Sequence, residues 1–302
     1  MTFLDRMASA PISWGVCEVP GWGLELPVDR VLSEMRELEL AATELGSDGY
    51  LPQDPVQLRD LCASYGLAMI GGFVPLVLHD PAQRAHTLAS ARRAAQLMGE
   101  AGATEFITAM VASVDWAPRF ELDSAGWDTA VAMLEEVELV VAEFGMAQAI
   151  HPHLGTMIER VDDVNAILDR SDVGWTFDTG HLMIGGYQPL DFLSRAGDRI
   201  RHVHLKDVHL DKAAPVLAGQ QTIMQGVQNG MFCAMGEGDV PIAEVVRALE
   251  RRGYGGWYVL EQDAAITGDE PAPGDGPMVD VRKSIEYLRA HNEAFLMSTE
   301  AS

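Results

Sequence analysis

The chain has little of what marks membrane and secreted proteins. Its three cysteines, Cys17, Cys62 and Cys233, are odd in number and widely separated, which excludes a disulfide framework or a zinc knuckle and favours a reducing compartment. No apolar run approaches the roughly 18 residues of a membrane helix. Residues 1–15 also lack the basic-then-apolar order of a secretory signal. We therefore expect a soluble cytoplasmic protein with no membrane partner.

Positive charge is also scarce. Lys and Arg number 21 against 45 Asp and Glu, which gives a formal net charge of -24, and only three of the basic residues are lysines. Such a surface repels phosphate backbones and anionic lipid, so we expect no nucleic-acid partner. The hydrophobic content of 48% is typical of a globular protein with a large core.

Short apolar runs alternate with amphipathic helical patterns along the whole chain. The runs span 9–16, 41–46, 68–77, 105–112, 147–151, 174–179, 200–206 and 256–261. The helical patterns include 28–39, 55–65, 81–101, 124–144, 161–170, 189–196, 240–252 and 279–296. Eight strand–helix units predict an α/β fold, a single (β/α)8 TIM barrel over residues 1–302. The rival, a doubly wound open sheet, would usually carry a Gly-x-Gly-x-x-Gly turn after its first strand, and none is present.

Two long segments follow the seventh and eighth runs. Residues 209–239 have helical character around Val216–Val227, and residues 263–277 are rich in Gly, Pro and acidic residues. Both leave the carboxyl end of a strand and so rise beside the mouth of a barrel. Loops this long in compact domains are usually functional or disordered. Residues 209–239 could form a lid over a small substrate or, equally well, a surface or oligomer-contact segment. The sequence leaves a homo-oligomer open.

Side chains that bind metals follow four of the apolar runs. The motifs are His151-Pro-His153, Asp178-Thr-Gly-His181, His202-Val-His204-Leu-Lys206-Asp207 and Glu261-Gln-Asp263. In a parallel barrel the carboxyl ends of all strands meet at one mouth, where such enzymes place their chemistry. Carboxylates and imidazoles delivered to one point form a site for a divalent cation. The candidate metal ligands are His151, Asp178, His204 and Glu261, and His153 is the alternative to His151.

Alternation along the seventh run places His202, His204 and Lys206 on one strand face. Three polar groups on one face of a buried strand are costly unless they are paired or bind something. We predict His204 to be a ligand and His202 to lie deeper, either orienting a ligand or closing a layer of the barrel interior. A divalent cation beside Lys206 would lower the pKa of its amine and make it a proton-transfer group.

The remaining candidates have plainer alternatives. Asp178 also suits a helix cap, and Glu261, which ends an apolar run, could instead pair with a distant Arg. The candidate catalytic residues are Lys206, His181, His153 and, more weakly, Glu44. The candidate substrate contacts are Trp14, Trp22, Tyr50 and Asp207, and core packing is the alternative for the three aromatic residues.

The set implies chemistry next to a ketone. Carboxylate and imidazole suit Mn²⁺, Co²⁺, Zn²⁺ or Mg²⁺ without choosing among them, and the lack of a thiolate argues against a structural zinc site. A cation with an open position polarises a ketone and acidifies the neighbouring C–H. Isomerisation, epimerisation or loss of a β-hydroxyl can follow, and spacing does not distinguish them.

The same motifs resemble a known family. The stretches are A-P-I-S-W-G-V-C-E-V-P-G-W-G at 10–23, T-E-L-G-S-D-G-Y-L-P at 43–52, H-P-H-L-G-T at 151–156, F-D-T-G-H-L at 177–182, H-V-H-L-K-D-V at 202–208, G-M-F-C-A-M-G-E-G-D-V at 230–240 and L-E-Q-D at 260–263. In order, they resemble the inosose dehydratase family within the xylose isomerase-like sugar isomerase/epimerase barrels. D-T-G-H alone is common to the wider group, whereas the N-terminal and H-L-K-D stretches are more specific.

The resemblance implies a metal, usually manganese or cobalt, on Asp178, His204 and Glu261. The wider group has a glutamate on the fifth strand where this chain has His151, so the fourth ligand is His151, His153 or water. The implied reaction dehydrates 2-keto-myo-inositol (scyllo-inosose) in inositol catabolism. One of Lys206, His181 and His153 would take the α-proton, and another would protonate the departing hydroxyl.

Several rivals share this barrel. A keto-sugar isomerase, epimerase or keto-glycoside lyase would use the same metal on another small keto-sugar. A dehydroshikimate-type dehydratase would require an Arg or Lys near the mouth besides Lys206, because its substrate is an anion. A non-catalytic polyol-binding protein should have lost ligands, and an endonuclease would require a basic stripe that this acidic chain lacks.

Overall fold

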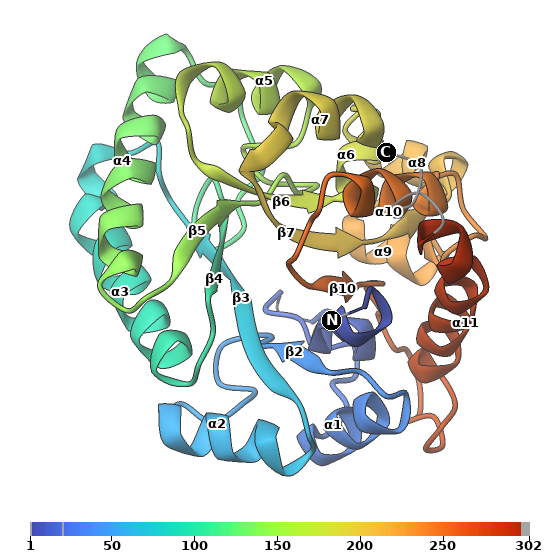
Figure 1. Cartoon of the computed structure of the whole chain (residues 1–302). Helices are drawn as coiled ribbons and strands as arrows, with labels where there is room; N and C mark the ends of the chain where they lie inside the picture. The colour runs from blue at the N-terminus through green and yellow to red at the C-terminus, as the bar shows by residue number, and fades with distance from the viewer. Residues whose placement is uncertain (1, 20, 297–302) are drawn as a thin grey trace.

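Eight parallel strands close into a barrel in the computed structural model, which describes residues 2–19 and 21–296 (Figure 1). The strands are β1 (Met7–Ser9), β2 (Ala42–Glu44), β3 (Ala68–Leu76), β4 (Glu105–Met110), β5 (Ala147–Ile150), β6 (Gly174–Asp178), β7 (Ile200–Leu205) and β10 (Tyr258–Leu260). Around the barrel the order is β1-β10-β7-β6-β5-β4-β3-β2, with every neighbouring pair parallel. The predicted (β/α)8 fold is confirmed, and the open sheet is excluded.

Helices surround the strands as the periodicity predicted (Figure 1). They are α1 (Val28–Glu37), α2 (Pro55–Ser64), α3 (Arg84–Glu100), α4 (Ser124–Ala142), α5 (Val161–Arg170), α6 (Thr179–Ile184), α7 (Pro189–Ala196), α8 (Leu210–Leu217), α9 (Ile223–Gln228), α10 (Ile242–Arg251) and α11 (Pro277–Leu296). Their apolar stripes pack on the outer face of the barrel, where Trp175, Phe177 and Phe192 are fully buried. Among the described residues, none of these helices has the length and apolarity to cross a membrane.

The first strand is shorter than the predicted run 9–16. It ends at Ser9, and a 3-10 turn over Pro11–Trp14 follows. Proline has no backbone N–H to donate to a ladder and fixes φ near the helical value, so Pro11 stops the strand and starts the turn. This early end moves Ile12 and Val16 out of the sheet and over the mouth of the barrel, where both line the cavity described below.

The insertion 209–239 contains two short helices, α8 and α9, which lie in the chain between the two strands of a small antiparallel sheet. Its strands β8 (Asp207–Val208) and β9 (Phe232–Cys233) pair antiparallel. The predicted helical character around Val216–Val227 is confirmed, but it belongs to two helices, because residues 218–222 form the turn between α8 and α9. Gly219 takes a positive φ of 68° in that turn, a conformation that glycine adopts at little cost.

The acidic loop 263–277 is held against the first βα segment. Ile266 forms an antiparallel bridge with Leu24, and the Arg30 guanidinium donates to the Ala272 carbonyl at 2.9 Å and to the Glu270 carboxylate at 2.9 Å. Both long segments therefore rise beside the carboxyl end of the barrel, as predicted.

Candidate metal centre and active site

A cavity of about 740 Å³ lies at the carboxyl ends of the strands. Its polar floor includes six side chains from β2, β5, β7 and β10 or the residues just beyond them: Glu44, His151, His153, Lys206, Glu261 and Asp263. Its walls are mainly apolar, and residues 216–224 of the insertion close one side. The size falls within the range of small-molecule sites.

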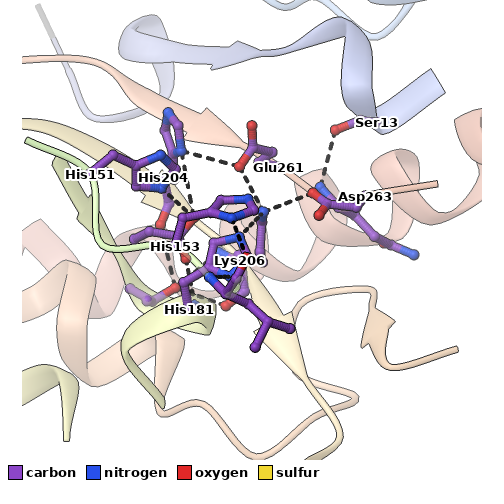
Figure 2. Close-up of polar contacts among 12 residues, drawn as sticks. Ser13, His151, His153, His181, His204, Lys206, Glu261 and Asp263 are labelled. Carbon is purple, nitrogen blue, oxygen red and sulfur yellow. Dashed lines mark hydrogen bonds and ion pairs between the residues drawn. The ribbon is translucent and has the colours of Figure 1, made fainter. Parts of the chain in front are cut away.

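The four predicted metal ligands converge at this floor. His151 Nε2 lies 3.3 Å from Asp178 Oδ2, and His204 Nδ1 lies 3.5 Å from the same oxygen and 3.1 Å from Glu261 Oε2. All four side chains are buried, and Figure 2 shows His151, His204 and Glu261 turned toward one another. Among the described residues, His151, Asp178 and His204 form one of the groups whose donor atoms are close enough to hold a single ion.

Asp178 caps a helix and also faces two of the other candidate ligands. It is the N-cap of α6, where Oδ1 accepts the His181 backbone N–H at 2.8 Å, while Oδ2 faces His151 and His204. Because Oδ1 is fixed by the cap, the second oxygen points into the cluster. Helix α6 was missed in the sequence, and it is the element that brings His181 over the site.

Lys206 is the hub of the second half of the site. Its Nζ lies 2.8 Å from Glu261 Oε2, 2.7 Å from Asp263 Oδ1 and 3.0 Å from His181 Nε2 (Figure 2). The His153 and His181 rings are adjacent, with centroids 3.8 Å apart. Three of the four predicted catalytic residues, Lys206, His181 and His153, therefore lie together, next to the carboxylates.

Burial and neighbouring charges shift the pKa values of the site residues, in opposite directions for Lys206 and the histidines. Burial alone would lower the pKa of Lys206, but Asp263, Glu261 and Asp178 outweigh it and raise the pKa above its ordinary value. The side chains of the protein therefore raise the pKa of Lys206, whereas the lowering predicted from the sequence depends on a bound divalent cation. Burial lowers the pKa of His153 to about 3 and that of His181 well below its ordinary value, so both are neutral imidazoles.

Glu44, the weakest of the catalytic candidates in the sequence, lies between two histidines. Its Oε1 lies 2.6 Å from His202 Nε2 and 2.9 Å from His204 Nε2, and all three side chains are buried. Burial would raise the pKa of Glu44, but His204 and His202 outweigh it and lower the pKa to about 2. Glu44 is thus an ionised carboxylate that touches the candidate ligand His204.

The predicted substrate contacts separate into two groups. Trp22 lines the cavity, with its Nε1 donating to the Ala264 carbonyl at 2.8 Å. Trp14 is fully buried away from it and donates to Glu34, and the Tyr50 hydroxyl donates to the Leu26 carbonyl. For these two, core packing is the better interpretation, because neither forms part of the cavity wall.

Asp207 is also placed differently from its prediction as a substrate contact. Its two carboxylate oxygens accept the backbone N–H groups of Val208, Gly236, Gly238 and Val240, at 2.8–3.0 Å. It lies outside the cavity wall, on the strand face opposite Lys206. Alternation along the chain explains this, since adjacent strand residues point to opposite faces. The residue anchors the end of the insertion.

Sequence reasoning missed an aromatic wall. Phe73 of β3 stacks on Trp116 with ring centroids 6.2 Å apart, and both line the cavity beside His151 and His153. Trp116 has a positive φ of 56°, which is rare for a bulky side chain. The rule that placed the other candidates, an informative side chain just beyond the carboxyl end of a strand, would have found Trp116 in the segment after β4.

Two arginines also line the cavity, and both are paired. The Arg119 guanidinium donates to Asp163 at 2.9 Å, and Arg160 lies 3.5 Å from Glu159 and 3.3 Å from Glu121. A dehydroshikimate-type enzyme would require a cation near the mouth besides Lys206, and both arginines near the mouth already have carboxylate partners.

Comparison with known proteins agrees with the fold and the motifs. Residues 29–291 match the family model described as a xylose isomerase-like TIM barrel. The IolI protein, solved with a zinc atom, superposes with a TM-score of 0.70 at 11% identity over 96% of this chain and 99% of that chain, a likeness that shows the fold. The chain belongs to the xylose isomerase-like TIM barrel family.

Closer relatives narrow this class. The chain is 33% identical over 275 residues to an inosose dehydratase of Geobacillus kaustophilus (strain HTA426), which covers 86% of this chain and 89% of that protein. It is 30% identical over 269 residues to the rhizopine catabolism protein MocC of Rhizobium meliloti, covering 85% and 81%. Within the barrel family, the chain therefore belongs with the inosose dehydratases, and the predicted resemblance is confirmed.

Proposed function

We propose that this protein is an inosose dehydratase, a hydro-lyase that removes water from 2-keto-myo-inositol in inositol catabolism. The observation that carries the proposal is the buried Lys206–His181 pair beside four convergent ligand side chains, in a chain 33% identical to a protein of that name. The reaction removes a proton next to the ketone and a hydroxyl from the following carbon, which yields a trihydroxycyclohexane-dione and water.

The donor set fits a divalent cation. His151, Asp178, His204 and Glu261 would hold it. His151 Nδ1 and His204 Nδ1 are buried without a hydrogen-bond partner among the described residues, although His204 Nδ1 faces the carboxylates of Glu261 and Asp178. Imidazole nitrogen and carboxylate oxygen suit Mn²⁺ or Co²⁺, our first choices, and also Zn²⁺ or Mg²⁺. When bound, such an ion polarises a ketone oxygen and stabilises the negative charge that follows loss of the α-proton.

The Lys206–His181 pair can move a proton at the substrate. Lys206 Nζ faces His181 Nε2, and the Leu154 backbone N–H faces His181 Nδ1 at 3.3 Å. A neutral imidazole accepts at only one nitrogen. The neighbouring carboxylates raise the pKa of Lys206 and burial lowers that of His181, so Lys206 holds the proton and can give one up, whereas the neutral His181 can take one up.

The cavity suits a small neutral ring. Trp22, Phe73 and Trp116 give it apolar walls, against which the C–H face of a polyol can pack, and the floor supplies polar partners for hydroxyl groups. His153 Nε2 is the second candidate for proton transfer, because Nδ1 faces the Leu154 carbonyl at 2.8 Å. Lys206, His181 and His153 would share the roles of base and acid.

The test follows dione absorbance after the chelated protein is mixed with 2-keto-myo-inositol and Mn²⁺, Co²⁺, Zn²⁺ or Mg²⁺ in turn. We expect metal-dependent absorbance that Glu261→Gln lowers by at least about 100-fold, since it removes a charged ligand. Glu286→Gln, an exposed carboxylate on α11, is the matched control and should keep full activity. A wild-type protein that binds the metal and forms no dione would overturn the dehydratase assignment and favour a keto-sugar isomerase, epimerase or keto-glycoside lyase.

A further inference from the structure

We infer that Glu44 and His202 form a positioning pair that holds His204 with Nδ1 turned toward the candidate metal centre. The inference rests on the proposed metal dependence and assigns Glu44 a role through His204 instead of direct proton transfer. Neither residue is one of the four proposed ligands. Both act on the geometry of one of them.

Glu44 reaches His204 across the barrel interior. Glu44 ends β2, whereas His202 and His204 lie on the same face of β7, and β1 and β10 separate the two strands. Glu44 is 2% exposed, and both histidines are fully buried. A carboxylate placed this deep is costly unless donors surround it, and the two imidazoles supply them at 2.6 and 2.9 Å.

The contacts determine which nitrogen of His204 is available. An ionised carboxylate only accepts hydrogen bonds, so the nitrogen of each ring that faces Glu44 Oε1 must carry the proton. That nitrogen is Nε2 in both rings. For His204 this leaves Nδ1, which lies 3.1 Å from Glu261 Oε2 and 3.5 Å from Asp178 Oδ2. Glu44 therefore reserves Nδ1 for the metal centre.

His202 keeps Glu44 in place. Its Nε2 contact is the shorter of the two, and its Nδ1 has no hydrogen-bond partner among the described residues. The hydrogen bond to Glu44 therefore orients the His202 ring, which also packs edge-on against the His204 ring with centroids 5.1 Å apart. Without it, the carboxylate would be free to turn toward the cavity, which Glu44 also lines.

A cation bound directly by Glu44, His202 and His204 is the competing interpretation, since their donor atoms are close enough for one. The distances argue against it. Metal–ligand bonds of roughly 2.0–2.2 Å place neighbouring donor atoms about 3 Å or more apart. The 2.6 and 2.9 Å separations here are hydrogen-bond lengths with a donor proton between the atoms.

The experiment titrates Co²⁺ into the chelated full-length protein and records its visible absorption spectrum. We expect Glu44→Gln and His202→Leu to weaken Co²⁺ binding by about 10- to 100-fold, the usual loss for partners behind a metal ligand, and to change the spectrum. His202→Gln should recover most of the affinity, because its amide N–H can still donate to Glu44. Glu286→Gln on the surface should match wild type.

The outcomes separate the inference from the proposed function. If Glu44→Gln and His202→Leu bind Co²⁺ within threefold of wild type with an unchanged spectrum, the positioning role is wrong. If His202→Gln is as weak as His202→Leu, a general packing role replaces it. Melting curves of the chelated variants identify any that do not fold. If Glu44→Gln does not fold, the comparison of His202→Leu with His202→Gln tests the inference. Wild-type protein that binds Co²⁺ and forms no dione contradicts only the dehydratase assignment. Wild-type protein that binds no Co²⁺ overturns both.

Discussion

Asp207 offers a sharp test of how the insertion 209–239 is anchored. Asp207 is 1% exposed, and its carboxylate accepts four backbone N–H groups, those of Val208 and Val240 on Oδ1 and those of Gly236 and Gly238 on Oδ2. Asp207→Asn keeps one oxygen and turns an NH₂ group toward the other pair of donors. Two of the four contacts are therefore lost, and the donors of that pair are left facing another donor.

The structure sets the magnitude. A hydrogen bond to a charged group contributes about 1.5–3 kcal/mol, and two are lost. The loss is partly offset because the asparagine is neutral and the cost of burying a charge disappears. We expect Asp207→Asn to lower the free energy of unfolding by about 3 kcal/mol. For a chain of this size that corresponds to a fall in Tm of about 6 °C, at roughly 2 °C per kcal/mol.

The assay is thermal melting of the substrate-free protein. Asp239→Asn is the matched control in the same segment, because its carboxylate accepts a single exposed backbone N–H, that of Leu210, and should cost under about 1 kcal/mol. A fall in Tm of less than about 2 °C for Asp207→Asn would refute the anchoring role. A raised KM with unchanged stability would instead restore Asp207 as a substrate contact.

Two further predictions concern stability away from the site. Burial raises the pKa of Glu105 to about 7, partly countered by Arg201. Protonation of Glu105 therefore favours the fold, and this contribution is present at low pH and lost as pH rises from about 4.5 through 7. Urea unfolding should show Glu105→Gln gaining about 2 kcal/mol over wild type between pH 5 and pH 8, and parallel curves would contradict this. Gly185→Ala would place a Cβ 2.0 Å from the Glu159 backbone carbonyl oxygen. We therefore expect this variant to lower the free energy of unfolding by about 2 kcal/mol or more, measured as a lower Tm. An unchanged Tm would show that α6 can shift to make room for the methyl group.

The barrel could be predicted from the sequence because each of its strands and helices leaves a pattern within a short stretch of residues. Each strand is a short apolar run, and each helix has an apolar stripe, so periodicity placed the helical patterns 55–65 and 161–170 within one residue of α2 and α5. The first strand was misplaced because Pro11 ends it inside an apolar run. The insertion was correctly predicted to be partly helical, but its two short helices have too few turns for periodicity to separate them.

The site could be predicted from the sequence only where the pattern within a single strand places the side chain. The His204 and Lys206 alternation fixes a shared face, and Asp178 and Glu261 end strands that must open on the mouth. What could not be derived is any contact between strands that are distant in sequence. Glu44 and His202 are 158 residues apart, and only the closed order of the barrel brings β2 and β7 to face each other.

The same limit explains the two kinds of error among the substrate contacts. Trp14 and Tyr50 follow the carboxyl ends of β1 and β2, as cavity residues do, yet each has a polar partner that turns it away, Glu34 for the indole and Leu26 for the hydroxyl. Trp116 was overlooked although it occupies an equivalent place after β4. Position along the strand therefore selects the residues near the mouth, and hydrogen-bond partners from other segments decide which of them face the cavity.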